Sequence, residues 1–266
     1  MSIMRLGFQR KQLSIPYVIF LICFVIAPVL VVFYYAFTNG QGQFTVQNFV
    51  NFFTSENTIG TLAYSLVTAV TVTACCTLVA YPVAYILARS DIKKKNVLLV
   101  LFIAPMWINF TLRVVALKEV LTMVEGNLAY HPFLNTVLGM TYDFLPFMIL
   151  PLYTTLEKLD KSYLEAAADL GASPVITFIK VTLPLSMPGL ISGVTMVFLP
   201  SMTNYVILDM LYNSTYIMGS LIGSYFHAYD WNSGSMISIV LLAIIFLVTW
   251  ATNGFSEEET TRGAFL

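Results

Sequence analysis

Six long apolar runs divide this chain, and they restrict its fold more than any other feature. A bilayer core about 30 Å thick is crossed by roughly 20 apolar residues in an α-helix. Four of the runs contain no charged residue, whereas the third contains Arg113 and the fourth contains Asp143. We therefore predict an all-α integral membrane protein with six transmembrane helices, over residues 15–37, 62–88, 97–117, 134–156, 183–208 and 235–252.

The composition agrees with lipid as the main solvent. Of the 266 residues, 58% are hydrophobic and only 10% are charged, whereas a soluble domain typically carries about 25% charged residues. The net charge of -1 argues against a nucleic-acid partner. The cysteines lie inside apolar runs without zinc or disulfide spacing, so we interpret them as packing residues: Cys23, Cys75 and Cys76.

The first run follows basic residues, as the apolar part of a signal peptide would. At 23 residues it is too long for that part, and no convincing small-residue cleavage site follows it. We predict a retained transmembrane helix. The absence of a dividing linker or charge block predicts one transmembrane domain over residues 1–266. The absence of a convincing internal repeat weighs against secondary carriers built from inverted repeats.

The basic residues predict the orientation, because cytoplasmic loops are enriched in Lys and Arg. Only Arg113 and Lys118, near the outer end of the third run, fall on the side away from both termini. Both termini are therefore predicted to be cytoplasmic. The other 11 of the 13 basic residues share their side: Arg5, Arg10, Lys11, Arg89, Lys93, Lys94, Lys95, Lys158, Lys161, Lys180 and Arg262.

The opposite side is acidic, and two interpretations of its acids stay open. Carboxylates around a mouth raise the local concentration of cations. Alternatively, they are the solvated loop charges that remain once basic residues are sorted inward. The acids in or beside these external loops are Glu56, Glu119, Glu125, Asp209 and Asp230.

Two further patterns concern how the helices pack. Seven prolines lie within the runs, and in lipid they are tolerated where protein or water satisfies the freed carbonyl groups. They suggest kinked helices around a pathway. Gly189 and Gly193 open the fifth run at a spacing that lets two helix backbones approach closely.

Residues 161–171 (KSYLEAAADLG) form a polar segment between the fourth and fifth runs. They are good helix formers but too few and too polar to span, so we predict a helix at the cytoplasmic surface. Its alanines offer a low surface that another protein can approach, and Glu165 adds a charge for a basic partner. Gly171 fits the helix C-terminus, where a left-handed residue is needed. The bland alternative is an ordinary connector between two spans.

This segment resembles the EAA loop of permease subunits of binding-protein-dependent ABC importers. The pattern is Glu-Ala-Ala, three residues, Gly, nine residues, Ile, one residue, Leu-Pro, and here Val181 replaces the Ile. The resemblance implies a type I importer permease fold with a cytoplasmic coupling segment at about 158–182. It also implies that the following residues couple the chain to an ATPase subunit: Glu165, Ala166, Ala167, Asp169, Gly171 and Pro184.

Two longer stretches, 146–200 and 107–121, resemble spermidine/putrescine importer permeases. This similarity implies a transport subunit in a bacterial plasma membrane that forms half of a polyamine pathway. The implied partners are two copies of a cytoplasmic ATP-binding subunit, a second homologous permease and an external binding protein. No Gly-x4-Gly-Lys-Ser/Thr phosphate loop occurs here, so ATP and Mg are expected on the partner ATPase and no cofactor on this chain.

A polyamine pathway needs carboxylates for ammonium groups and aromatic faces for cation–π contacts. An acid within a span is a functional hypothesis by default, although Asp143 has the alternative of an internal ion pair with Arg113. We predict no metal site. The predicted pathway residues are Asp143, Asp209, Tyr142, Tyr205, Trp107 and Asn109.

Three alternatives to a polyamine permease remain at this point. One is an importer permease for another small solute, such as ferric ion, thiamine or sulfate. Another is a stand-alone channel or secondary carrier, which would leave the EAA-like segment unexplained. An intramembrane enzyme is disfavoured, because the only histidines, His131 and His227, lie in predicted external loops and no Gly-x-Ser-x-Gly motif occurs.

Overall fold

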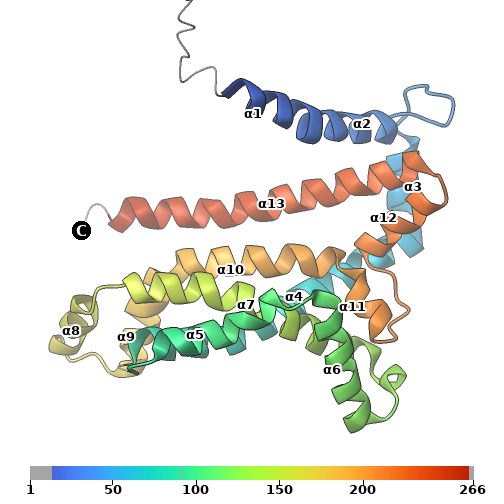
Figure 1. Ribbon diagram of the computed structural model, residues 1–266. Coiled ribbons are helices and arrows are strands. Elements are labelled where there is room, and N and C mark those ends of the chain that lie inside the picture. The colour runs from blue at the N-terminus through green and yellow to red at the C-terminus, as the bar shows by residue number, and fades with distance from the viewer. Residues whose placement is uncertain (1–13, 91, 264–266) are drawn as a thin grey trace, which may run out of the picture. The chain divides into compact units, whose positions relative to one another are not determined.

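The computed structural model describes residues 14–90 and 92–263, with side chains described for 16–90 and 92–250. This part of the chain is built from helices, and its β-structure is limited to an isolated bridge between Thr38 and Phe44 (Figure 1). The mostly helical fold predicted from the apolar runs is confirmed. The basic residues of the N-terminal tail, Arg5, Arg10 and Lys11, lie outside the described residues.

The chain divides into two compact units. One consists of residues 1–56 and 222–242, and the other of residues 57–221 and 243–266. The single transmembrane domain expected from the sequence stays a prediction.

The first unit begins with one nearly continuous helical run. Its elements are α1 (Ser14–Leu21), the π-helical turn η2 (Ile22–Ile26), α2 (Ala27–Ala36), α3 (Gln47–Thr54), and the parts within 222–242 of α12 (Met218–His227) and α13 (Trp231–Gly263).

Two asparagines hold the end of α2 in this unit. Asn232 Nδ2 donates hydrogen bonds to the carbonyl oxygens of Tyr35 at 2.9 Å and Thr38 at 2.6 Å. Asn48 Nδ2 donates to the carbonyl oxygens of Ala36 and Thr38, each at 2.9 Å. Because α2 ends here, its last carbonyl groups need such donors. The amides therefore tie α3 and the start of α13 to α2.

The second unit is organised around two long antiparallel neighbours, α7 and α10, which lie side by side (Figure 1). Its elements are α4 (Glu56–Arg89), α5 (Lys95–Ile103), η3 (Ala104–Trp107), α6 (Phe110–Glu125), η4 (Leu128–Tyr130), α7 (Pro132–Lys158), α8 (Ser162–Asp169), α9 (Pro174–Thr177), η5 (Phe178–Thr182), α10 (Leu183–Thr203) and α11 (Tyr205–Met210).

Glycines bring α7 and α10 together. A Cβ at Gly189 would lie 2.5 Å from Thr155 Oγ1 and 2.8 Å from the carbonyl oxygen of Pro151. A Cβ at Gly193 would lie 2.5 Å from Met148 Sδ. The Gly-x-x-x-Gly pair therefore serves close helix packing within this chain, against α7.

Two π-helical turns each end two residues before a proline. In η2 the N–H of Ala27 bonds to the carbonyl of Ile22, and Pro28 follows; η5 has the same relation to Pro184. A proline lacks the N–H and crowds the carbonyl one turn earlier. The wider π turn accommodates that crowding without ending the helix.

The third predicted span is not the continuous helix expected over 97–117. It consists of α5 and α6, which meet at an angle of 100°. Pro105 lies in the short 3-10 turn η3 between them, and Asn109 starts a new helix by accepting hydrogen bonds from two backbone N–H groups. By length and composition five helices can cross a membrane within the described residues, or six if this bent pair counts as one span.

The fifth predicted span, 183–208, is also interrupted. Helix α10 ends at Thr203, and α11 begins after Asn204, whose backbone leaves the helical region. Pro200 lies inside the last turn of α10 and its carbonyl accepts the N–H of Asn204. Asp209 and Tyr205 therefore belong to a separate short helix.

Candidate coupling segment and substrate pathway

The coupling segment is built around the short helix α8, which follows the C-terminal end of α7. Ser162 N donates to Asp160 Oδ1 at 2.9 Å and so satisfies one N–H at the start of the helix. That hydrogen bond holds the pKa of the Asp160 carboxyl below its ordinary value. This bond defines the start of α8, which is separated from the end of α7 by three residues.

One side of α8 faces the protein and the other is free. Ala167 is buried, whereas Glu165, Ala166 and Asp169 are exposed. The exposed side therefore presents the carboxylates of Glu165 and Asp169 and the methyl group of Ala166. This is the low, acidic surface that the sequence predicts, although its contact with an ATPase subunit stays a prediction.

Gly171 ends α8 as expected. Its φ of +77° lies in the region that favours glycine. The N–H of Gly171 bonds to the carbonyl of Ala168 at 2.9 Å, and the N–H of Ala172 bonds back to that of Ala167 at 3.0 Å. This is the Schellman arrangement of a helix C-terminus. The prediction of a left-handed glycine here is confirmed.

Helix α8 and the segment after it expose large apolar side chains that are not among the predicted coupling residues. Leu170 is 89% exposed, more than any other large apolar side chain named here. Exposed apolar side chains can face another protein or lipid, and Pro174–Thr203 is long and apolar enough to enter a membrane. The sequence contains a sign of this exposure, because apolar residues recur within a segment that is too polar to span a membrane. The group consists of Tyr163, Leu170, Val175, Ile176 and Ile179.

Helix ends next to α8 are linked by a polar network. Arg89 Nη1 donates to the carbonyl oxygen of Leu159 at 3.0 Å. Lys95 Nζ lies 3.2 Å from Glu157 Oε1, to which Tyr153 Oη also donates at 2.7 Å. The end of α4 and the start of α5 are thereby joined to the last turn of α7. In the sequence, Arg89 and Lys95 bear only on topology, because their partners Leu159 and Glu157 lie 70 and 62 residues away.

Near the middle of α7, Asp143 is paired with Arg113 of α6. Arg113 Nη2 lies 2.5 Å from Asp143 Oδ1, and the two side chains are only 6% and 4% exposed. The internal ion pair left open by the sequence is present. A pathway role for Asp143 stays a prediction.

The other predicted pathway residues are more exposed and are spread over several elements. Trp107 is 77% exposed on η3, Tyr142 is 41% exposed on α7, and Tyr205 is 38% exposed on α11. Asp209 is exposed on α11. Asn109 has a local role, since its side chain accepts from the N–H groups of Thr111 and Leu112 as the N-cap of α6.

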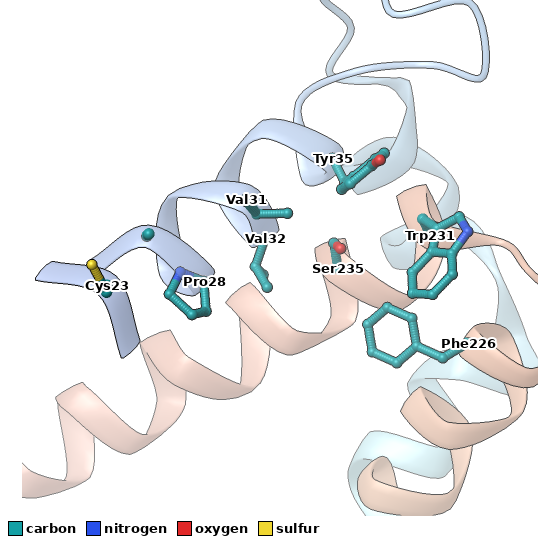
Figure 2. Close-up of a pocket in the computed structure, with 9 residues that line it drawn as sticks. Cys23, Pro28, Val31, Val32, Tyr35, Phe226, Trp231 and Ser235 are labelled. Carbon is teal, nitrogen blue, oxygen red and sulfur yellow. The ribbon is translucent and has the colours of Figure 1, made fainter. Parts of the chain in front are cut away.

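A cavity of about 550 Å³ lies in the first unit and contains none of the predicted pathway residues (Figure 2). Cys23, Pro28, Val31 and Val32 line it from the N-terminal helical run. Tyr35, Phe226, Trp231 and Ser235 point toward the same space (Figure 2). The lining is almost wholly apolar and carries no charge, so it offers no carboxylate for an ammonium ion.

The exposed Glu-Ala-Ala helix α8 lies between two membrane-length helices, α7 and α10. This is the arrangement expected of a transport permease. Residues 80–256 match the family model described as "Binding-protein-dependent transport system inner membrane component". The chain belongs to this family. It is the membrane component of an ABC importer, a multi-pass membrane protein and not an enzyme.

The chain is homologous to curated spermidine/putrescine permeases. It is 34% identical over 281 residues to the "Spermidine/putrescine transport system permease protein PotB" of Haemophilus influenzae, with 95% of this chain and 96% of that one covered. It is 35% identical over 217 residues to PotB of Escherichia coli, with 74% and 79% covered.

Solved structures share the fold. A bacterial ABC transporter involved in the import of the acidic polysaccharide alginate matches with a TM-score of 0.69 and 14% identity, over 93% of this chain and 94% of that chain. The MetNI methionine ABC transporter matches with a TM-score of 0.57 and 17% identity, over 77% and 99%. At these identities the likeness concerns the fold alone.

Proposed function

We propose that the chain forms half of the pathway by which an ATP-driven importer takes up a polyamine such as spermidine or putrescine. The observation that carries the proposal is 34% identity to a spermidine/putrescine permease over nearly the whole length of both chains. A polyamine is a polycation, and residues 96–157 and 181–261 contain only two basic residues, Arg113 and Lys118. A pathway built from these segments therefore has little positive charge to repel it.

The exposed candidates for substrate contact are Asp209, Tyr205, Tyr142 and Trp107. Asp209 supplies a carboxylate on α11, and Tyr205 lies one turn earlier on the same helix. Aromatic faces bind ammonium groups through cation–π attraction. Asn109 contributes by fixing the start of α6 directly after Trp107.

Energy for transport enters through α8 in this proposal. Glu165, Ala166, Ala167 and Asp169 form the helix that docks on a cytoplasmic ATP-binding subunit. Gly171 ends the helix, and Pro184 begins the next span. Two copies of that subunit bind the ATP and Mg, and a second homologous permease completes the pathway. An external binding protein delivers the substrate to a bacterial plasma membrane in which both termini of this chain are cytoplasmic.

The substrate is tested with the assembled complex in proteoliposomes. Radiolabelled spermidine and putrescine, delivered by the binding protein, should enter in an ATP-dependent manner and stimulate ATP hydrolysis. A complex that hydrolyses ATP but responds to neither compound would point to another solute. Uptake by this chain without an ATPase subunit would instead support a stand-alone carrier.

The coupling role is tested by reversing the charge of Glu165. Glu165→Lys should lower substrate-stimulated ATP hydrolysis about tenfold, because an exposed interface charge is replaced by a repulsive one. Glu119→Gln, an exposed acid on α6 at the far end of the second unit from α8, is the matched control and should retain stimulation. Equal stimulation in Glu165→Lys and the wild type would contradict the docking role.

A further inference from the structure

Both basic residues of the segments 96–157 and 181–261 lie on α6. Arg113 and Lys118 are five residues apart on this helix, which lies at the end of the α7–α10 pair away from α8 (Figure 1). Under the proposed function, a polycation passes this end of the protein. Two cations there would raise its energy, unless each is neutralised or withdrawn.

Arg113 is both withdrawn and neutralised. Its side chain is 6% exposed and its Nη2 lies 2.5 Å from Asp143 Oδ1. The neighbouring Val114 is fully buried, so this turn of α6 is packed against the protein. The Asp143 carboxylate is equally enclosed, and it meets Arg113 rather than an open channel.

Stability alone is a poor reason for this pair. The free energy lost when two charges leave water offsets much of the attraction between them. A protein with apolar residues of similar size in place of the pair is often equally stable. The arrangement is also incomplete, since Arg113 Nε and Nη1 are buried without a hydrogen-bond partner among the described residues. An ion pair in a span that is not optimised for stability indicates a functional constraint.

Lys118 is engaged as well. Its Nζ donates to Tyr212 Oη at 3.2 Å and lies 4.2 Å from the centre of the Tyr212 ring. Tyr212 has a φ of +58°, unusual for a residue with a large side chain. The next residue, Asn213, is buried and donates to Tyr64 Oη and Thr136 Oγ1, each at 2.9 Å. The loop therefore holds Tyr212 where it can receive Lys118.

We infer that Asp143 is a positioning residue that neutralises Arg113 and fixes α6 on α7, so that the Arg113 charge does not repel a passing polyamine, and that it does not itself bind the substrate. The inference rests on the proposed substrate. It assigns specificity to the neutralisation of Arg113 at this end of the protein, whereas Lys118 keeps its charge and is held against Tyr212.

The experiment is a double-mutant cycle in the complete importer complex. Asp143→Asn leaves Arg113 charged and unpaired, and should lower spermidine uptake at least about tenfold. The double variant Arg113→Gln/Asp143→Asn buries no charge, and should restore uptake to within about threefold of the wild type. Glu119→Gln removes an acid from the same helix without releasing Arg113, and should stay within about twofold.

The double variant decides between the two roles of Asp143. A double variant that assembles and hydrolyses ATP, yet takes up spermidine as poorly as Asp143→Asn, would show that the carboxylate binds substrate. Unchanged uptake in Asp143→Asn would show that the Arg113 charge has no influence. A double variant that fails to assemble would show that the fold needs the charges themselves. Each of these outcomes overturns the inference.

Failure of the proposed substrate is recognised separately. It appears in the wild-type complex, as absence of a response to both polyamines. The positioning of α6 has a readout without substrate, namely the thermal unfolding midpoint of the purified complex. Asp143→Asn should lower that midpoint, and the double variant should recover most of the loss. Spermidine uptake in the same preparations then reports the charge effect.

Discussion

The N-terminal span and α7 are both long enough to cross a membrane, but they use their surfaces in opposite ways. No residue in the most apolar window of Pro16–Ala36 is buried within the chain, whereas 56% of the corresponding window of Pro132–Lys158 is buried. The N-terminal span is also the more apolar of the two. Apolar character therefore follows exposure here, the reverse of a soluble protein.

The difference teaches where a membrane chain can place polar residues. Helix α7 contains Asn135, Thr136 and Asp143, all buried, together with two internal prolines. Each of these three polar side chains has a partner inside the second unit, such as Arg113 for Asp143. Among the described residues, the most apolar window of the N-terminal span has no buried position in which such polar side chains could be enclosed.

The largest test of this contrast compares one leucine from each span. Leu152→Ala, in the core around α7, should lower the free energy of unfolding by about 2–5 kcal/mol because it leaves a cavity. Leu30→Ala, at a position 61% exposed, should change it by less than about 0.5 kcal/mol. The thermal unfolding midpoint of the purified complex is the measurement. Equal losses would show that another subunit buries the N-terminal span.

A smaller effect is expected from adding one methyl group between α7 and α10. Gly189→Ala places a Cβ 2.8 Å from the backbone carbonyl of Pro151, which has no rotamer by which to move away. We expect a loss of about 1–3 kcal/mol from overpacking. At Gly223, in α12, no atom lies within 4 Å of the added Cβ, so Gly223→Ala is the matched control and should not destabilise. An unchanged midpoint in Gly189→Ala would contradict the close helix approach.

The third test measures chemical access rather than stability, and compares two native thiols. Cys23 is exposed on the N-terminal span, whereas Cys76 is fully buried and its Sγ lies 3.7 Å from the carbonyl oxygen of Thr141. In single-cysteine variants, a lipid-soluble maleimide should modify Cys23 at least about tenfold faster, because access limits the buried thiol. Mass spectrometry over time gives both rates. Protection of Cys23 in the complex would reveal a covering subunit.

Much of the fold was predictable because length and hydropathy are properties of single segments. The α7 and α10 spans were found in this way, and the end of α8 was found from the conformational preference of Gly171. The bend between α5 and α6 was not, because a window average carries no direction. Pro105 and Asn109 were visible in the sequence, but a proline in a span can kink a helix without turning it by 100°.

The candidate sites divide in the same manner. The coupling segment was found from a contiguous motif, whereas its links through Arg89 and Lys95 depend on how distant helix ends meet. For Asp143, the sequence left an ion pair and a pathway role open. The distance of 2.5 Å to Arg113 follows from the packing of α6 on α7, which no local pattern encodes.

The π-helical turn η5 gives the coupling segment a fixed rotational setting. Each residue of an α-helix advances the side chains by about 100°, so the extra residue in a π turn rotates everything that follows by that angle. Upstream of Phe178–Thr182 lies the segment with Leu170 and Ile176; downstream lies α10 with Gly189 against α7. Deleting one uncharged residue from η5 would keep the charge but would turn Ile176 by about that angle relative to α10. The number of residues in η5 therefore sets how the segment before it is rotated relative to α10.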